Sequence, residues 1–190
     1  MGFSPVKTGL AFLPMVAALA TTAQVANLYL LPRFGPKPVV PVGMLLDAFA
    51  LVMLHRLGLH SSYATHVLPY LLIMGVGFGL SVAPAFATGT LGLPPHDAGV
   101  GSASINTAQQ VGGSIGTALL NTLAASAAAA FLVGRALTPL TRSEAALHSY
   151  TTAFLWSAGI FVIGAIVSGL VFRKGNLSEL GPTTGDVAHM

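Results

Sequence analysis

The sequence predicts an all-α membrane protein with five transmembrane helices, and two observations carry this prediction. Of the 190 residues, 54% are hydrophobic and only 7% are charged, whereas about 25% of the residues in a typical soluble domain are charged. A soluble chain of this length needs charged side chains on its surface to stay in solution. The apolar residues also gather in five segments that approach or exceed the ~20 residues a helix needs to cross the hydrocarbon core.

The first expected span covers residues 8–31 and has a clear helix start before it. Ser4 suits an N-cap, and Pro5 follows it at the first helical position. An alternative interpretation takes this segment as a signal peptide, but its apolar run is longer than the roughly 7 to 15 residues of such a signal. The remaining spans are expected at residues 39–54, 66–93, 98–132 and 150–172.

Proline and capping patterns add detail to these spans. Pro14, Pro69 and Pro84 fall within the first and third spans, where each should remove a backbone hydrogen bond and bend its helix. Thr141 and Glu144 have the spacing of a capping box, which predicts a short surface helix before the fifth span.

The domain organisation follows from these segments. Residues 1–172 form the predicted transmembrane region, and residues 173–190, rich in Gly, Thr and Pro, form a predicted disordered tail. The bias of Lys and Arg does not settle orientation, because the loops on the two sides carry equal sets: Arg33, Lys37, Arg173 and Lys174 against Lys7, Arg56, Arg135 and Arg142.

Composition argues against several classes of function. The eight Lys and Arg residues are scattered, so the sequence has no basic patch for nucleic acid. It has no cysteine, its histidines lack metal-binding spacing, and its serines show no triad pattern with a base. We therefore expect no catalytic residue, no metal ligand and no cofactor, and we do not expect an enzyme.

The fourth span is uncharged yet carries a row of polar side chains at intervals of three or four residues. An amide without a hydrogen-bond partner costs roughly several kcal/mol when it faces lipid. The row should therefore face protein or water. The amides either bond neighbouring helices, at about 0.6 kcal/mol each, or line an aqueous cavity and contact a solute. The candidate substrate-cavity residues are Asn106, Gln109, Gln110, Thr117 and Asn121.

Glycines predict where helices pack closely. Gly112 and Gly116 form a small-xxx-small pair on the fourth span, and Gly75, Gly77 and Gly79 crowd the third. Small residues let helix backbones approach each other in lipid.

Asp47 lies near the middle of the second span. A carboxylate there costs about 2.5 to 3.5 kcal/mol on insertion scales, which makes Asp47 the candidate for proton coupling. Two other interpretations stay open: a protonated carboxyl that is hydrogen-bonded to a neighbouring helix, or a shifted span that leaves Asp47 nearer the membrane interface.

Four segments together resemble the C-terminal part of fourteen-helix drug/proton antiporters, the EmrB/QacA-type branch of the major facilitator superfamily. They read "GFSPVKTGLAFLP", "LLPRFGPKPVVPVG", "LPPHDAGVGSASINTAQQVGGSIGTALLNT" and "YTTAFLWSAGIFVIGAIVSGLVF". The resemblance covers residues 2–173 and is most specific over residues 94–121. It implies that the spans are helices ten to fourteen of a bacterial plasma-membrane protein, with the "RFGPKP" turn and the tail in the cytoplasm.

The resemblance also implies a function. Members of this family exchange protons for amphipathic drugs, at sites near the bilayer midplane between two repeats. Phe86, Phe154 and Trp156 would supply aromatic faces to such a site. The family's first nine helices have no counterpart in this sequence, so Met1 is a misplaced start, the start of a truncated gene or that of a short product. Five helices cannot enclose a cavity between two repeats, so we expect no transport by this chain alone. The alternative is a non-transporting partner, or the product of a degenerate gene, that packs against a larger membrane protein.

Overall fold

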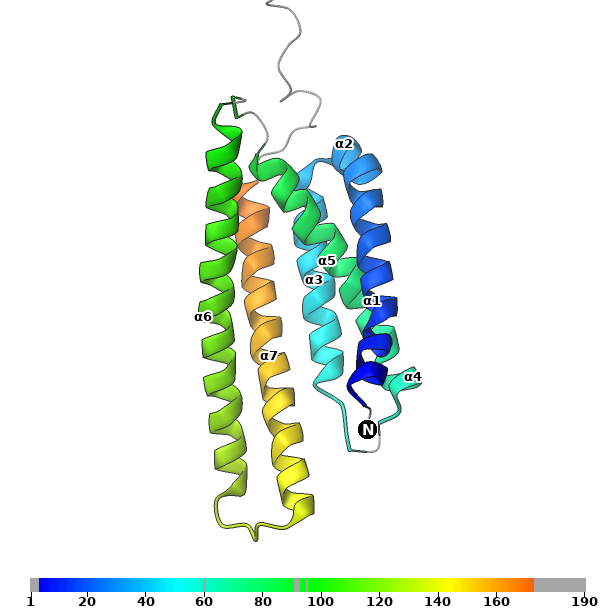
Figure 1. Cartoon of the computed structure of the whole chain (residues 1–190), viewed down its shortest axis with the longest axis vertical. Coiled ribbons are helices and arrows are strands. Elements are labelled where there is room, and N and C mark those ends of the chain that lie inside the picture. Colours follow the sequence, from blue (N-terminus) through cyan, green and yellow to red (C-terminus); the bar gives the residue numbers. More distant parts are fainter. Residues whose placement is uncertain (1–3, 60, 91–92, 95, 173–190) are drawn as a thin grey trace, which may run out of the picture.

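The computed structural model describes residues 4–59, 61–90, 93–94 and 96–172, and every element among them is a helix (Figure 1). Five stretches of this part are long and apolar enough to cross a membrane, which confirms the predicted fold class. The predicted tail at 173–190 lies outside the described residues. The elements are α1 (Pro5–Val25), η1 (Ala26–Leu30), α2 (Leu31–Phe34), α3 (Pro36–Leu54), α4 (Tyr63–His66), α5 (Leu68–Gly89), α6 (Ala98–Leu132) and α7 (Pro139–Val171).

The first span starts as predicted and ends in an unusual turn. The Ser4 hydroxyl accepts a hydrogen bond from the Lys7 backbone N–H at 3.3 Å. The last turns change to a π-helix, in which the Leu31 N–H bonds to the Ala26 carbonyl five residues back. Pro32 follows directly, and a proline ring clashes with an ordinary preceding helical turn. The wider π turn therefore lets the helix continue to Phe34.

The second span begins three residues earlier than predicted. Pro36 and Pro38 stand in the first turn of α3, where backbone N–H groups have no partner within the helix and proline costs nothing. Gly35 precedes them with φ 73°, a conformation that favours glycine and turns the chain sharply out of α2. Pro41 is an interior helix proline that the sequence analysis did not single out.

The prediction that Pro69 bends a helix from within was wrong, because Pro69 also occupies a first helical turn, that of α5. Pro14 and Pro84 do lie inside α1 and α5. The third predicted span is divided at Val67, where φ is −116°, into the short α4 and the longer α5.

The prediction of a separate surface helix before the fifth span was also wrong. One continuous helix, α7, runs from Pro139 to Val171. Its capping box joins Thr138 and Thr141, one turn before the predicted pair of Thr141 and Glu144. No Gly or Pro occurs between positions 140 and 158, so nothing in the chain stops the helix once it has begun.

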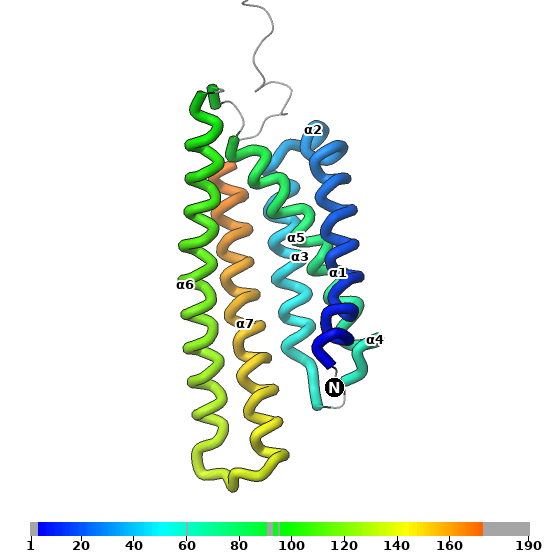
Figure 2. Tube along the Cα trace, viewed as in Figure 1, coloured from blue at the N-terminus to red at the C-terminus, as the bar shows by residue number. Residues whose placement is uncertain are grey.

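The helices are arranged in a row in which α5 packs between α1 and α3, α3 packs on α7, and α7 packs on α6 (Figure 2). Glycines make these close contacts possible, and two sides of α5 use them. Gly75 and Gly79 face α1: an added methyl group at Gly79 would lie 2.7 Å from the Thr22 Cβ, and one at Gly75 would collide with the Met15 carbonyl. Gly77 faces α3.

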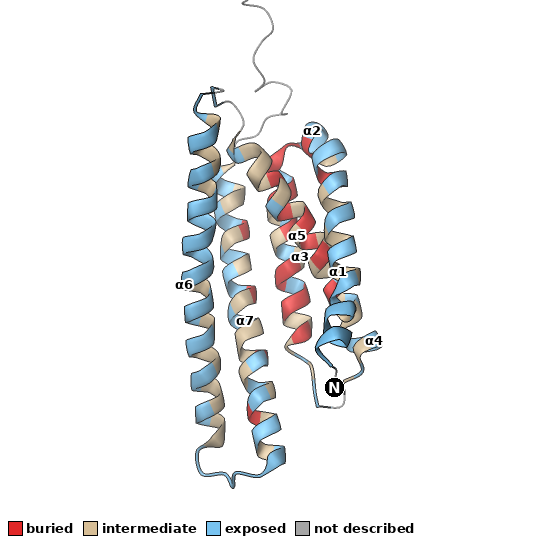
Figure 3. Ribbon diagram, in the orientation of Figure 1, coloured by how far each residue is buried: buried red, intermediate tan, exposed pale blue. Residues whose placement is uncertain are grey.

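Buried residues gather in α3 and α5, whereas α6 has none (Figure 3). A small core formed by Ala48, Leu51 and Ala158 joins α3 to α7, with Phe154 and Phe161 packed against it. With 35 and 33 residues, α6 and α7 are each about 50 Å long at about 1.5 Å per residue. They therefore form a hairpin that extends well past the end of α3 (Figure 1).

Candidate functional site

The predicted amide row lies on an open side of α6. This helix packs mainly against α7 and touches α5 slightly, through a half-buried face that includes Leu120, Leu123 and Phe131. All five predicted site residues are exposed: Asn106, Gln109, Gln110, Thr117 and Asn121. Their surroundings are therefore not supplied by the helices described.

Hydrogen bonding sets these five residues apart from their polar neighbours. The hydroxyls of Thr107, Ser114 and Thr122 each donate to a carbonyl of their own helix, at 2.8 to 2.9 Å. Such back-bonded hydroxyls are already satisfied and tolerate an apolar environment. Within the described part of the chain, the five predicted side chains form no hydrogen bond. Together with the Ser126 hydroxyl, which also forms none, they are the polar side chains on α6 that still require a partner.

The structure brings three of the five together. Gln110, Thr117 and Asn121 line one shallow hollow of about 490 Å³, with Gly113, Ser114 and Ala118 between them. Asn106 and Gln109 do not line it.

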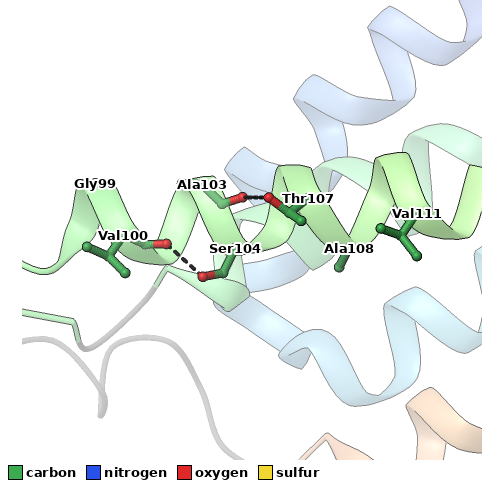
Figure 4. Close-up of a pocket in the computed structure, with 7 residues that line it drawn as sticks. All are labelled: Gly99, Val100, Ala103, Ser104, Thr107, Ala108 and Val111. Atoms are coloured by element: carbon green, nitrogen blue, oxygen red, sulfur yellow. Dashed lines mark hydrogen bonds between the residues drawn. The ribbon is translucent and has the colours of Figure 1, made fainter.

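A second hollow of about 640 Å³ lies nearer the start of α6 and has a different lining (Figure 4). Its two hydroxyls, from Ser104 and Thr107, bond to the carbonyls of Val100 and Ala103. This hollow therefore offers an apolar surface with its polar groups already paired.

The exposed face of α7 provides an internal comparison. Every exposed side chain between positions 155 and 171 is apolar, including Trp156, Ile163 and Leu170. That composition suits contact with lipid acyl chains. The exposed face of α6 carries unpaired amides and does not suit lipid.

Asp47 is placed apart from the amides, inside the contact between α3 and α5. Its side chain is 0% exposed, and neither carboxyl oxygen has a hydrogen-bond partner among the described residues. Asp47 is the twelfth of the 19 residues of α3 and therefore lies near the middle of that helix. The described residues show no hydrogen bond between a protonated carboxyl and a neighbouring helix.

Sequence reasoning missed two amides on the first span. Gln24 near the end of α1 and Asn27 in η1 are both exposed, and neither side chain forms a hydrogen bond within the described residues. The signal that identifies the α6 row, an amide in an apolar span, identifies these two residues as well.

Other sequence features fall in different places. No Cβ added at Gly112 or Gly116 would meet an atom within 4 Å, so this pair packs against nothing in the described structure. Phe154 belongs to the packing between α3 and α7, Trp156 is exposed on α7, and Phe86 is half-buried on α5. The described residues contain no cluster of acidic and His side chains able to hold a metal ion.

Comparison with known proteins decides the family. Residues 1–117 match the Major Facilitator Superfamily. The chain belongs to this superfamily. It is 36% identical over 190 residues to the puromycin resistance protein pur8 of Streptomyces alboniger. This alignment covers 99% of the chain and 37% of pur8.

Two further relatives are also named as resistance or export proteins. The tetracenomycin C resistance and export protein of Streptomyces glaucescens is 36% identical over 129 residues, 66% of the chain and 23% of that protein. The lincomycin resistance protein LmrB of Listeria innocua is 29% identical over 146 residues, 76% of the chain and 31% of that protein. The matched part of the chain therefore spans between 23% and 37% of the length of these relatives.

These matches confirm the resemblance to major facilitator drug-resistance transporters that the sequence predicted. Together with the five apolar helices, they identify a multi-pass protein of the bacterial plasma membrane, in contact with the lipid bilayer.

Proposed function

We propose that this chain forms the C-terminal part of a proton-coupled transporter that exports antibiotics or other amphipathic drugs. The observation that carries the proposal is the exposed and unpaired amide row of α6. The similarity to resistance and export proteins supports the same conclusion. In this proposal the chain has no catalytic residue, and its "RFGPKP" turn and tail lie in the cytoplasm.

The chemistry of α6 suits an amphipathic solute. A site for such molecules needs apolar walls and a few uncharged groups that donate and accept hydrogen bonds. Gln110, Thr117 and Asn121 supply the polar groups, and Val111 and Ile115 are exposed apolar side chains on the same helix. The missing wall would come from the other repeat of the transporter, as in major facilitator proteins generally.

Proton coupling is assigned to Asp47 in this proposal. The carboxyl lies between α3 and α5, and α6 packs on α7 and α5. Asp47 therefore acts on the amide row through helix movements, because no direct contact joins the two. Two helices can transmit such a movement, because α5 and α7 each contact both α3 and α6.

The alternative proposal is a non-transporting partner that packs against a larger membrane protein. One observation favours it: Gly112 and Gly116 leave an open, small-residue surface on α6 that another helix could approach closely. In that case the amides would bond to the partner's helix.

Substitutions in a complete transporter that contains this chain separate the two proposals. Gln110→Leu and Asn121→Leu each remove a group that would bond the drug, and a typical hydrogen bond contributes about 1 kcal/mol, which is roughly a fivefold effect. We expect drug resistance and drug efflux to fall severalfold while the amount of protein in the membrane stays constant. Ser114→Ala is the matched control, because the Ser114 hydroxyl lies in the same hollow but is bonded to its own helix.

A fall in membrane abundance would instead support the packing role. Unchanged efflux in both leucine variants would overturn the assignment of α6 as a wall of the drug site.

A further inference from the structure

The backbones of α3 and α5 touch at a pair of glycines. A methyl group added at Gly43 on α3 would lie 2.6 Å from the carbonyl oxygen of Gly77 on α5, and one added at Gly77 would lie 2.8 Å from the carbonyl oxygen of Gly43. No ordinary side chain fits at either position. At this point the two helices therefore meet backbone to backbone.

Asp47 lies one helical turn beyond Gly43, and its carboxyl group sits against Gly77. A methyl group added at Gly77 would lie 2.6 Å from the Asp47 Cγ. The Asp47 side chain is fully buried by residues of this chain, so its surroundings, unlike those of the α6 amides, do not depend on helices elsewhere in a transporter.

No opposite charge faces this carboxyl from the helices packed against it. The only titratable residue on α5 is Tyr70, seven positions before Gly77, and α7 has none from Thr151 to Val171. On α3 itself the other titratable residue is Lys37, ten positions away and therefore about 15 Å along the axis.

The absence of a counter-charge determines which form of the carboxyl the contact tolerates. A buried carboxylate needs a partner or water, and the described surroundings of Asp47 offer neither a cation nor a hydrogen-bond donor. The neutral acid fits the closed contact. The ionised form requires water, and water requires space between α3 and α5.

We propose that Asp47 makes the contact between α3 and α5 a proton-dependent joint. With the carboxyl protonated, the helices touch at Gly43 and Gly77. When its O–H bond breaks, the proton passes to entering water and the helices separate around the hydrated carboxylate. The inference rests on the proposed proton-coupled transport and supplies its mechanical step, because α5 also contacts α6.

A distance measurement on the 190-residue chain in lipid nanodiscs tests the joint. The chain has no cysteine, so nitroxide labels can be attached to cysteines placed at Val42 and Val82, which are exposed on α3 and α5. The distance between the two labels is measured by pulsed electron–electron double resonance at about pH 5 and at about pH 9, a range that starts above the ordinary pKa of a carboxyl group. We expect this distance to be longer at the higher pH. The expected increase is about 3 Å, the spacing of one hydrogen-bonded water.

Three variants define the outcome. Asp47→Asn, of the same shape but unable to ionise, should keep the short distance at both pH values. Ser81→Ala is the matched control, since Ser81 is buried one turn beyond Gly77 and its hydroxyl bonds to the Gly77 carbonyl of its own helix; it should retain the pH response. Gly77→Ala should give the long distance even at low pH, because its methyl group takes the place of the Asp47 carboxyl.

A wild-type distance that does not change with pH overturns the joint, and so does a pH response that persists in Asp47→Asn. Neither result touches the proposed drug export, which is tested by drug efflux from the complete transporter. Conversely, a joint that opens with pH in a protein that exports no drug overturns the transport proposal alone.

Discussion

The Nδ1 atom of His55 lies 2.9 Å from the backbone carbonyl oxygen of Thr151. Because a carbonyl only accepts hydrogen bonds, Nδ1 carries the hydrogen. The bond joins the residue that follows α3 to the first half of α7, 96 positions later in the chain.

Removing this bond should loosen the hairpin. We expect His55→Ala to lower the free energy of unfolding by about 1 kcal/mol, the typical contribution of one hydrogen bond. Thermal unfolding in detergent can be followed by the fluorescence of Trp156, the single tryptophan, which lies on α7. His66→Ala is the control, because the His66 ring is exposed and, among the described residues, bonds only to its neighbour Thr65. Equal losses in both variants would contradict a specific role for His55.

The start of α7 depends on Thr138. Its hydroxyl accepts a bond from the Thr141 N–H at 3.2 Å, and the Thr141 hydroxyl accepts one from the Thr138 N–H at 2.8 Å. Thr138→Ala should therefore reduce stability by about 1 kcal/mol, whereas Glu144→Gln should change it little, since Glu144 takes no part in the cap. Circular dichroism during thermal unfolding distinguishes the two, and a larger effect of Glu144→Gln would contradict the observed cap.

Glycines on α5 and α6 should respond differently to the same substitution. Gly75→Ala forces a methyl group into the Met15 carbonyl and should destabilise the chain by about 1 to 3 kcal/mol, as overpacking does. Gly112→Ala meets nothing within 4 Å and should be neutral or stabilising by up to about 1 kcal/mol, because alanine favours helix. The melting temperatures of the two variants, each compared with that of the unaltered chain, test this difference. A lower melting temperature for Gly112→Ala would mean that α6 packs more tightly than described.

In a complete transporter, Gly112→Ala has a second use. If another helix packs on this side of α6, the methyl group should reduce the amount of folded protein there although it does no harm in the 190-residue chain. Quantifying both proteins in membranes provides the comparison.

Chemical labelling tests the surroundings of the α6 row. Cysteines placed one at a time at Asn106, Gln110 and Thr117 in a complete transporter should react with water-soluble maleimides or cross-link to neighbouring helices. Cysteines at Ile163 and Ile166 on the apolar face of α7 should react only with lipid-soluble probes. Lipid-only labelling of the α6 positions would remove the physical basis of the cavity.

The sequence by itself determined the number of spans, some of their limits and the polar character of α6, because hydrophobic length and helix starts depend on neighbouring residues. Residues 98–132 form α6 as predicted, and Ser4 caps α1. The start of α3 at Pro36 and the cap at Thr138 were missed, and Pro69 was misjudged, because the effect of a proline or a cap depends on its position within the helical turn. A pattern of apolar residues locates that position only approximately.

Only the tertiary structure decided which glycines bring helices together and where Asp47 lies. Gly77 and Gly112 look alike in an apolar segment, yet one touches α3 and the other faces open space. Asp47 is separated from the α6 amides because α3 packs against α5 and α7. Such contacts join residues tens of positions apart, and the direction in which each helix turns its face is fixed by how all of the helices pack together.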